Sequence, residues 1–231
     1  MREHSVRKTP KMKVITLASR KGGTGKTTLA INLAAIANRS ERACVVDMDP
    51  QQSTQVWKRL RAQDETLPKL STGSCRPSGL PKLLGELRSR NMRWVFIDTP
   101  PSLTAVVEVA IQHADLVLIP TRPDAFNLAA VTATIVLARQ YAKPYVVVLN
   151  EAPSLRDGVA SPMVKEARFQ TSKAAELYAG RIWKSQLTHR NAIAYALNVG
   201  HALTDRPSYE AAYQEFERLW RQIRSLIRRE Q

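Results

Sequence analysis

The sequence predicts one α/β domain, in which a mostly parallel, twisted β-sheet carries helices on both faces. Short runs of consecutive apolar residues alternate with segments of helical periodicity, which is the pattern of parallel strands buried from both sides. The length of 231 residues suits one domain, and 44% hydrophobic with 24% charged residues can form a core, which excludes wholesale disorder. No apolar run approaches the roughly 18 to 20 residues needed to span a bilayer.

The expected elements follow one another after a basic N-terminal segment. Residues 1–12 lack periodicity and are expected to form a flexible tail, so residues 13–231 form the domain. Residues 67–80, rich in Ser, Pro and Gly, are the least regular stretch, and about the last fifty residues contain little strand signal. We expect strands at 14–18, 43–47, 94–98, 114–120 and 145–150, and helices at 27–38, 53–61, 81–90, 128–141, 192–197 and 209–229.

Charge and cysteine content narrow the class of protein. Lys and Arg number 35 against 20 acidic residues, a net charge of +15, which indicates a polyanionic partner such as nucleic acid or an anionic membrane; solubility alone is the alternative. Cys44 and Cys75 cannot make a disulfide framework, and no Cys/His cluster has zinc spacing. The N-terminus lacks the apolar core of a secretory signal, so we expect a cytoplasmic protein.

A glycine-rich segment lies between the first expected strand and the first helix. Residues 21–28 read Lys-Gly-Gly-Thr-Gly-Lys-Thr-Thr, which fits G-x-x-x-x-G-K-[ST] when a lysine replaces the first glycine. Glycines allow backbone N–H groups to cradle phosphate oxygens, and the helix N-terminus adds its positive dipole. In this pattern Lys26 reaches the β and γ phosphates of a nucleotide, and the Thr27 hydroxyl binds Mg²⁺. The segment therefore predicts a P-loop.

Carboxylates stand at the ends of two further strands, where open α/β sheets bind ligands. Asp98 ends the strand at 94–98 and suits an outer-sphere ligand of Mg²⁺. Asp47 and Asp49 follow the second strand two residues apart, a spacing that puts both on one face of a strand. One of them can help to organise the metal while the other orients a water toward the γ phosphate. The alternative is that they are solvated loop acids.

Together these motifs resemble the ParA/MinD ATPases, which carry a deviant Walker A motif. The resemblance covers roughly residues 12–226, is nearer the ParA branch, and implies a small, single-domain member of the P-loop NTPase fold without an N-terminal helix-turn-helix extension. The segments that carry it are residues 21–28, Asp47-x-Asp-Pro-Gln51, Phe96-Ile-Asp-Thr-Pro-Pro101, Ile119-Pro-Thr-Arg-Pro123 and Val148-Leu-Asn150.

The resemblance implies roles at the matching positions. Lys21 is similar to the signature lysine that reaches the partner's phosphates in an ATP-sandwich dimer, and Asp49 to the residue that acts through the attacking water. Asn150 matches an asparagine that reads adenine, and Pro207 lies about where a proline packs on the base. The expected site comprises catalytic Lys21, Lys26 and Asp49; nucleotide-binding Lys21, Gly22, Gly23, Thr24, Gly25, Lys26, Thr27, Thr28, Asn150 and Pro207; and metal-binding Thr27, Asp47 and Asp98.

Basic residues are the candidates for DNA contact, since ParA-like dimers bind DNA without sequence preference through their C-terminal halves. Such contacts go to phosphates and require charge rather than a base-reading helix. For each cation the alternative is a solvated helix face, and a further basic cluster stands at residues 57–61. The candidates are Arg181, Lys184, Arg190, Arg218, Arg221 and Arg224.

The last expected helix allows three interpretations. Its apolar residues recur at spacings of three and four between Tyr213 and Ile227, with arginines on the other side. The apolar stripe either packs on the sheet, which we favour, or lies on anionic lipid as in the MinD relatives. In the first case the polar face remains available for DNA.

These observations lead to one preferred function and two alternatives. The resemblance implies an ATP- and Mg²⁺-dependent partition ATPase that forms a homodimer with ATP and binds non-specific DNA in that state. A ParB-like or other cargo adaptor would stimulate its slow hydrolysis, and we expect it to be cytoplasmic and nucleoid-associated, positioning a plasmid, chromosome or protein cargo. One alternative is a MinD-like membrane-associated positioning ATPase. The other is a synthetase or iron–sulfur reductase, although Cys44 and Cys75 are poorly placed for a bridging cluster.

Overall fold

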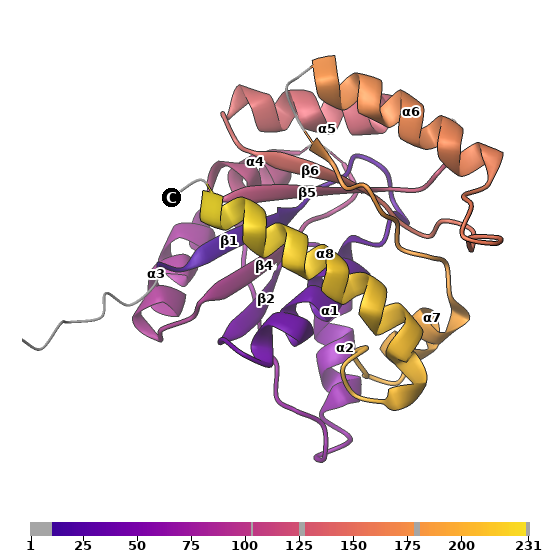
Figure 1. The fold of residues 1–231 in the computed structure, drawn as a ribbon. Helices are drawn as coiled ribbons and strands as arrows, with labels where there is room; N and C mark the ends of the chain where they lie inside the picture. The colour runs from indigo at the N-terminus through magenta and orange to yellow at the C-terminus, as the bar shows by residue number, and fades with distance from the viewer. Residues whose placement is uncertain (1–10, 103, 125–127, 178–180, 230–231) are drawn as a thin grey trace, which may run out of the picture.

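The computed structural model describes residues 11–229 except 103, 125–127 and 178–180, and shows a seven-stranded sheet. The strand order is β3-β2-β4-β1-β5-β6-β7, and every pair of neighbouring strands is parallel. This confirms the expected α/β architecture (Figure 1). The strands are β1 Lys13–Leu17, β2 Ala43–Asp47, β3 Ser71–Ser74, β4 Trp94–Asp98, β5 Leu116–Thr121, β6 Tyr145–Leu149 and β7 Arg181–Ile182.

The described residues also form eight α-helices and two short 3₁₀ turns, of which the last two helices and the second turn follow the last strand. Each connection between strands that are consecutive in the chain contains a helix, as is usual for parallel strands. The helices are α1 Lys26–Asn38, α2 Ser53–Arg61, α3 Leu80–Ser89, α4 Ala105–Gln112, α5 Leu128–Gln140, α6 Pro162–Leu177, α7 Asn191–Asn198 and α8 Glu210–Arg229, and the 3₁₀ turns are Pro77–Gly79 and Pro207–Tyr209.

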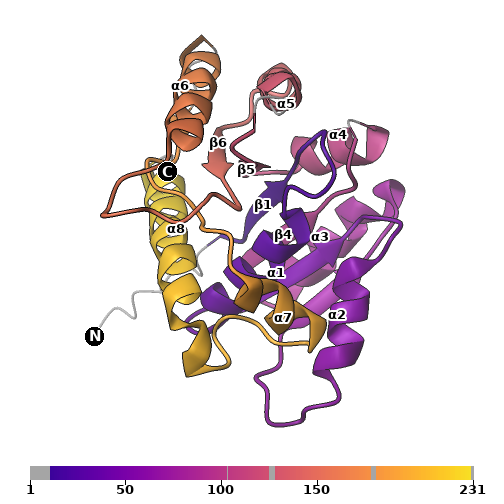
Figure 2. The same ribbon diagram turned by 90° about the vertical axis from the view of Figure 1, so that its right-hand side faces the viewer.

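The helices cover the sheet in two layers because alternate residues of each strand point to opposite faces. Ile15 and Leu17 of β1 pack against α1, α7 and α8, whereas Val14 packs on the other face, where α3 and α4 lie. The same second face continues under α5, which contacts β5 and β6. Figure 2 shows α8 and α3 on opposite sides of the strands.

Helix α8 is part of the core. Phe216, Leu219 and Ile223 are almost completely buried, and the Trp220 ring meets the Trp94 ring edge-on at a centroid distance of 4.7 Å. The apolar stripe of the last helix therefore packs on the sheet, as we favoured from the sequence. Among the helices in the described part of the chain, none combines the length and apolar character needed to cross a membrane.

Several elements differ from the sequence-based expectation. β3 lies inside residues 67–80, which looked irregular, and β7 lies where little strand signal was seen. Helices α4 and α6 were not predicted. Residues 1–10 of the expected tail lie outside the described residues, while Met12 is buried against the second face of the sheet.

The parallel register gathers the carboxyl ends of three central strands at one edge. Leu17 of β1 is level with Asp98 of β4, and Asp98 is level with Asp47 of β2. The segments that follow these residues therefore start side by side, and they are the ones that contain the candidate site.

Candidate functional site

The phosphate loop joins β1 to α1 and depends on two glycines. Gly23 and Gly25 have φ angles of 68° and 86°, in the left-handed region that other residues avoid. A Cβ atom at Gly25 would lie 2.2 Å from Nδ2 of Asn150, so no other residue fits there without displacing that side chain. Gly25 also precedes the first residue of α1, so the loop leads directly into the N-terminus of this helix.

Lys26 is the buried cation of the loop. Its side chain folds back toward the loop, where Nζ lies 3.5 Å from the carbonyl oxygen of Lys21. Burial lowers the pKa of Lys26, while the nearby carboxylates of Asp98 and Asp49 act in the opposite direction. A buried ammonium group at the end of a glycine loop is suited to a phosphate, which supplies the countercharge and the hydrogen-bond acceptors.

Thr27 and Asp98 form the part of the site that fits a divalent cation. The Thr27 hydroxyl donates to Oδ2 of Asp98 at 2.6 Å, whereas Oδ1 of Asp98 is buried and has no hydrogen-bond partner. Burial raises the pKa of Asp98 to about 7, while the hydrogen bond from Thr27 and the charge of Lys26 act in the opposite direction. In the described residues, no group of three or more His, Cys, Asp or Glu side chains is arranged to hold a metal ion by itself. This donor set suits Mg²⁺, which commonly uses few protein oxygens and takes its other ligands from phosphate and water.

Asp47 and Asp49 have different surroundings. Asp47 is buried at the end of β2, where its Oδ1 accepts the N–H of Asp49 and its Oδ2 the N–H of Thr54, each at 3.0 Å. Burial raises the pKa of Asp47, and the two N–H donors oppose this shift. Asp49 is half-buried in a turn and accepts the N–H of Gln51 at 2.9 Å. The strand ends at Asp47, so the two carboxylates are related by a turn and not by a shared strand face.

The side chain of Lys21 points toward Asp124 of the same chain. Its Nζ lies 3.5 Å from Oδ1 of Asp124, and both side chains are partly exposed, at 42% and 37%. Gly22 and Gly23 beside it are exposed. The head of the loop is therefore accessible to another molecule.

Asn150 contacts the loop directly, whereas Asn32 links α1 to Leu203, four residues before Pro207. Nδ2 of Asn150 donates to the Thr24 carbonyl at 2.8 Å. Asn32 of α1 donates to the Thr28 carbonyl and accepts the N–H of Leu203, just before the exposed Pro207. Sequence reasoning missed Asn32, whose apolar neighbours in α1 gave no indication of a link.

The candidate DNA-binding residues differ in exposure and in pairing. Arg181, Lys184 and Arg218 are exposed, and Arg224 is half-buried. Arg190 forms an ion pair with the buried Glu215 at 2.9 Å, and Arg221 pairs with Glu217 one turn away at 3.2 Å. Arg190 is thus partly committed to holding α8 against the segment that precedes α7.

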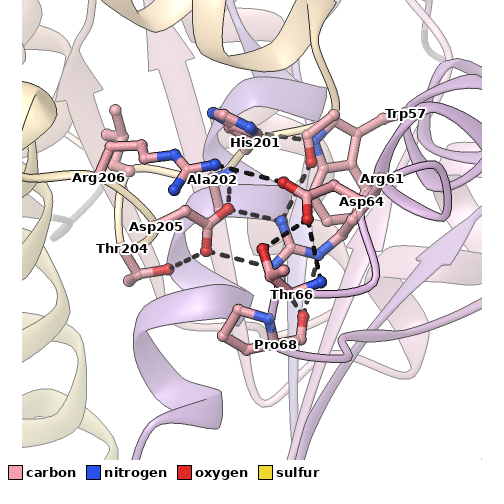
Figure 3. Close-up of polar contacts among 12 residues, drawn as sticks. Trp57, Arg61, Asp64, Thr66, Pro68, His201, Ala202, Thr204, Asp205 and Arg206 are labelled. Carbon is pink, nitrogen blue, oxygen red and sulfur yellow. Dashed lines mark hydrogen bonds and ion pairs between the residues drawn. The ribbon is translucent and has the colours of Figure 1, made fainter.

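A second missed feature is a buried ion pair between α2 and the segment before α8. Arg61 contacts Asp205 through two hydrogen bonds of 2.6 Å and 3.2 Å, and the side chain of Asp205 is inaccessible to solvent (Figure 3). Nε1 of Trp57 donates to the His201 carbonyl at 3.0 Å. The sequence offered only a basic cluster at residues 57–61, because nothing in it shows which arginine turns inward.

The loop, the buried lysine and the strand-end carboxylates match a known domain. A family model described as the CobQ/CobB/MinD/ParA nucleotide binding domain matches residues 15–199. The chain belongs to this family. It is a nucleotide-binding protein of the group that contains the ParA and MinD ATPases, as the motifs had indicated.

Two curated relatives illustrate the similarity in sequence. Over 125 residues the chain is 35% identical to Maintenance of carboxysome distribution protein A of Gloeobacter kilaueensis, which covers 53% of this chain and 55% of that protein. Over 177 residues it is 32% identical to the chromosome-partitioning ATPase Soj of Thermus thermophilus, which covers 64% of this chain and 71% of Soj. The chain thus spans about half the length of the first of these relatives.

Solved structures share the fold at low sequence identity. A McdA–ATP complex from Cyanothece superposes with a TM-score of 0.70 at 19% identity, covering 94% of this chain and 96% of the other. The cell division ATPase MinD of Pyrococcus furiosus gives a TM-score of 0.69 at 19% identity, covering 94% and 100%. These similarities support the overall fold.

Proposed function

We propose that this chain is an ATP-dependent switch that positions a cargo. It forms a homodimer with ATP, binds DNA without sequence preference in that state, and is released when a cargo adaptor stimulates its slow hydrolysis of ATP. The observation that carries this proposal is the hydrogen bond between Thr27 and the buried Asp98, whose second carboxylate oxygen has no partner, together with the buried Lys26. A divalent cation would supply the missing partner of Asp98, and the phosphate bound to that cation would supply the countercharge of Lys26.

The side chains divide the work of binding and hydrolysis. The N–H groups of residues 22–25 and the Lys26 ammonium bind the triphosphate, and Thr28 and Asn150 complete the nucleotide site with Pro207 at the base. Thr27 and Asp98 would hold Mg²⁺, which would neutralise charge on the phosphates. Asp49 orients the attacking water and accepts a proton from it. Asp47 holds the N–H of Asp49 and thereby positions that turn beside the metal.

Lys21 supplies the link between hydrolysis and dimerisation. In the single chain its Nζ lies 3.5 Å from Asp124, on an exposed part of the loop. In the dimer it leaves Asp124 and contacts the phosphates of the partner's ATP, where a fixed positive charge stabilises the transferring oxygens. Each active site is then complete only when two copies meet.

The net positive charge of the chain supports the proposed DNA binding. Soj is a chromosome-partitioning ATPase, and the McdA relative maintains carboxysome distribution, so related proteins act on different cargoes. The exposed Arg181, Lys184 and Arg218 offer phosphate contacts on a chain of net charge +15. We infer a ParB-like or other adaptor as the stimulating partner, and a nucleoid-associated, cytoplasmic location.

The first experiment measures anisotropy of a labelled DNA duplex of arbitrary sequence at moderate salt with ATP, with ADP and without nucleotide. We expect binding to be at least tenfold tighter with ATP. Lys26→Ala should abolish nucleotide binding and with it this gain, whereas Asp49→Ala should bind ATP and remain on DNA without releasing phosphate. Equal affinity with ATP and ADP would contradict the switch, and wild-type turnover of Asp49→Ala would contradict the role of Asp49.

Sedimentation with anionic liposomes under the same conditions tests the MinD-like alternative. The apolar face of α8 is buried against the sheet, so ATP should not increase liposome binding. An ATP-dependent gain on liposomes without one on DNA would replace the DNA-binding switch with a membrane-binding one.

A further inference from the structure

A groove at the open edge of the sheet has no role in the nucleotide site. β3 is the terminal strand of the order, and a groove of about 900 Å³ runs along it. Residues of α2 and of the connection at 62–70 line one side, and residues of α3 line the other. Its volume lies in the range of pockets that bind ligands.

The backbone of β3 presents unpaired groups to this groove. Cys75 donates its N–H to the Asp47 carbonyl on β2, and alternate residues of a strand point their N–H and C=O groups to opposite sides. Ser71 and Gly73 share the direction of Cys75, so Thr72 and Ser74 turn their backbone groups away from β2. Among the described residues, neither of them makes a hydrogen bond outside the sheet. The edge therefore offers donors and acceptors to an additional strand.

A side chain in the groove also lacks a partner. Thr72 lines the groove, and its Oγ1 is buried without a hydrogen bond. Buried hydroxyl groups are normally satisfied, because leaving one unpaired costs roughly 1 to 3 kcal/mol. An incoming polar backbone would supply the missing partner.

The two sides of the groove differ in polarity. Leu83 and Leu87, one turn apart on α3, are half-buried and form an apolar side. The rim is basic, and its four exposed cations take part in no ion pair within the described residues. Of the acids on the rim, Asp64 is already paired with Arg206 at 3.3 Å. The cations are Arg42, Lys58, Lys69 and Arg90.

The wall of the groove at 62–70 is held in place before any partner binds. Arg61 donates to the Pro68 carbonyl through Nε at 3.0 Å and through Nη2 at 2.7 Å, while its guanidinium also contacts Asp205 (Figure 3). Thr66 donates to Asp64 at the same turn. Since the wall is fixed, little conformational entropy is lost when a partner enters.

We propose that this groove binds an extended acidic segment of a partner protein, which adds to β3 as an eighth strand. Main-chain hydrogen bonds to Thr72 and Ser74 supply the affinity, as in other cases of strand addition to a sheet edge. Side chains of an extended segment alternate between its two faces. Apolar residues at alternate positions therefore pack on Leu83 and Leu87, and acidic residues between them meet Lys58 and Lys69.

The test uses a fluorescein-labelled heptapeptide of alternating Glu and Val, with the wild-type chain and charge-matched variants. Lys58→Glu/Lys69→Glu should weaken binding at least tenfold, while Lys82→Glu/Lys165→Glu, which places the same charges outside the groove, should not. Thr72→Pro removes an outward N–H without removing a bond to β2 and should also weaken binding. Two further peptides serve as probes, one with Lys for Glu and one with Pro for Val; both should bind at least tenfold more weakly.

Several outcomes would overturn the proposal. These are the absence of saturable binding, equal binding of the proline peptide, and equal binding to the two double variants. A DNA duplex that displaces the peptide from the wild-type chain, and that itself binds Lys58→Glu/Lys69→Glu more weakly, would show that the groove binds nucleic acid instead. Hydrogen exchange with solvent gives a direct test. If the Thr72 and Ser74 amide hydrogens exchange more slowly when the peptide is bound, strand addition is supported, and this readout remains usable in a variant whose stability is altered. None of these readouts depends on ATP, so failure here leaves the proposed switch untouched.

Discussion

At the scale of single residues, the proposed switch predicts that Lys21 separates binding of nucleotide from dimerisation. Its ammonium group contacts Asp124 in the single chain, whereas the ammonium group of Lys26 lies inside the loop, near the carbonyl oxygen of Lys21. Lys21→Ala should therefore keep ATP affinity within about threefold of wild type but lose the ATP-dependent dimer, as measured by light scattering. Lys165→Ala, on the exposed surface of α6, is the control. A normal dimer of Lys21→Ala would refute the contact between protomers.

Cys44 provides a test of the redox alternative. Burial in β2 raises the pKa of its thiol to about 12, and burial also raises the pKa of the half-buried Cys75. A thiol with a raised pKa gains thiolate character only as the pH rises toward that value, so Cys44 should remain unreactive in the folded chain from pH 7 to 9. Titration with a thiol reagent should detect none in native Cys75→Ser and one after denaturation. Rapid reaction of native Cys75→Ser at pH 7 would contradict this.

At the scale of elements, Gly200 fixes how closely α2 meets the segment after α7. Its φ is 75°, and a Cβ atom there would lie 2.3 Å from the backbone nitrogen of Arg61. Gly200→Ala should lower the free energy of unfolding by about 2 to 4 kcal/mol, since backbone strain and overpacking add. Gly85→Ala, in an open position of α3, should raise it by about 0.5 to 1 kcal/mol. Urea denaturation measures both, and equal effects would contradict the close contact.

Elements that the sequence predicted are those whose own pattern requires them. β2 and β4 have the expected bounds because their apolar runs are buried on both faces. β3 reads Ser-Thr-Gly-Ser and carries no such pattern; it is a strand because β2 offers it hydrogen bonds. The residues of α4, Ala-Val-Val-Glu-Val-Ala-Ile-Gln, are rich in β-branched types, so their helical state reflects packing more than propensity.

The candidate site was predictable where local spacing determines it. Strand, glycine loop and helix are contiguous, and Asp98 is the last residue of its strand, so Lys26, Thr27 and Asp98 were expected to meet. The contact of Asn150 with Thr24 and the pairing of Arg61 with Asp205 join segments far apart in the chain. Such contacts depend on how elements pack, and charge alone did not distinguish the buried Arg61 from its exposed neighbours.

At the scale of the whole molecule, the proposed dimer would combine two charged surfaces. Two copies of a +15 chain carry twice that charge before nucleotide is counted, so many weak phosphate contacts can act together. Lys184→Gln, which removes an exposed cation, should reduce the slope of log affinity for DNA against log salt by roughly 1 to 2, counting one contact in each protomer. Arg190→Gln should mainly lower stability, since it leaves Glu215 buried without its partner. A salt series with thermal unfolding distinguishes the two effects, and an unchanged slope in Lys184→Gln would exclude that residue from the interface.

The contact between Gly200 and Arg61 also has a mechanical consequence. With no side chain between the two backbones, and with Asp205 and His201 bonded to the same helix, α2 and residues 200–205 cannot separate without breaking several contacts at once. The turn at Asp49 leads into one end of this unit, and Pro207 follows the other. A displacement of the turn at Asp49 would therefore be passed through α2 to residues 200–205, because these parts would move as one unit.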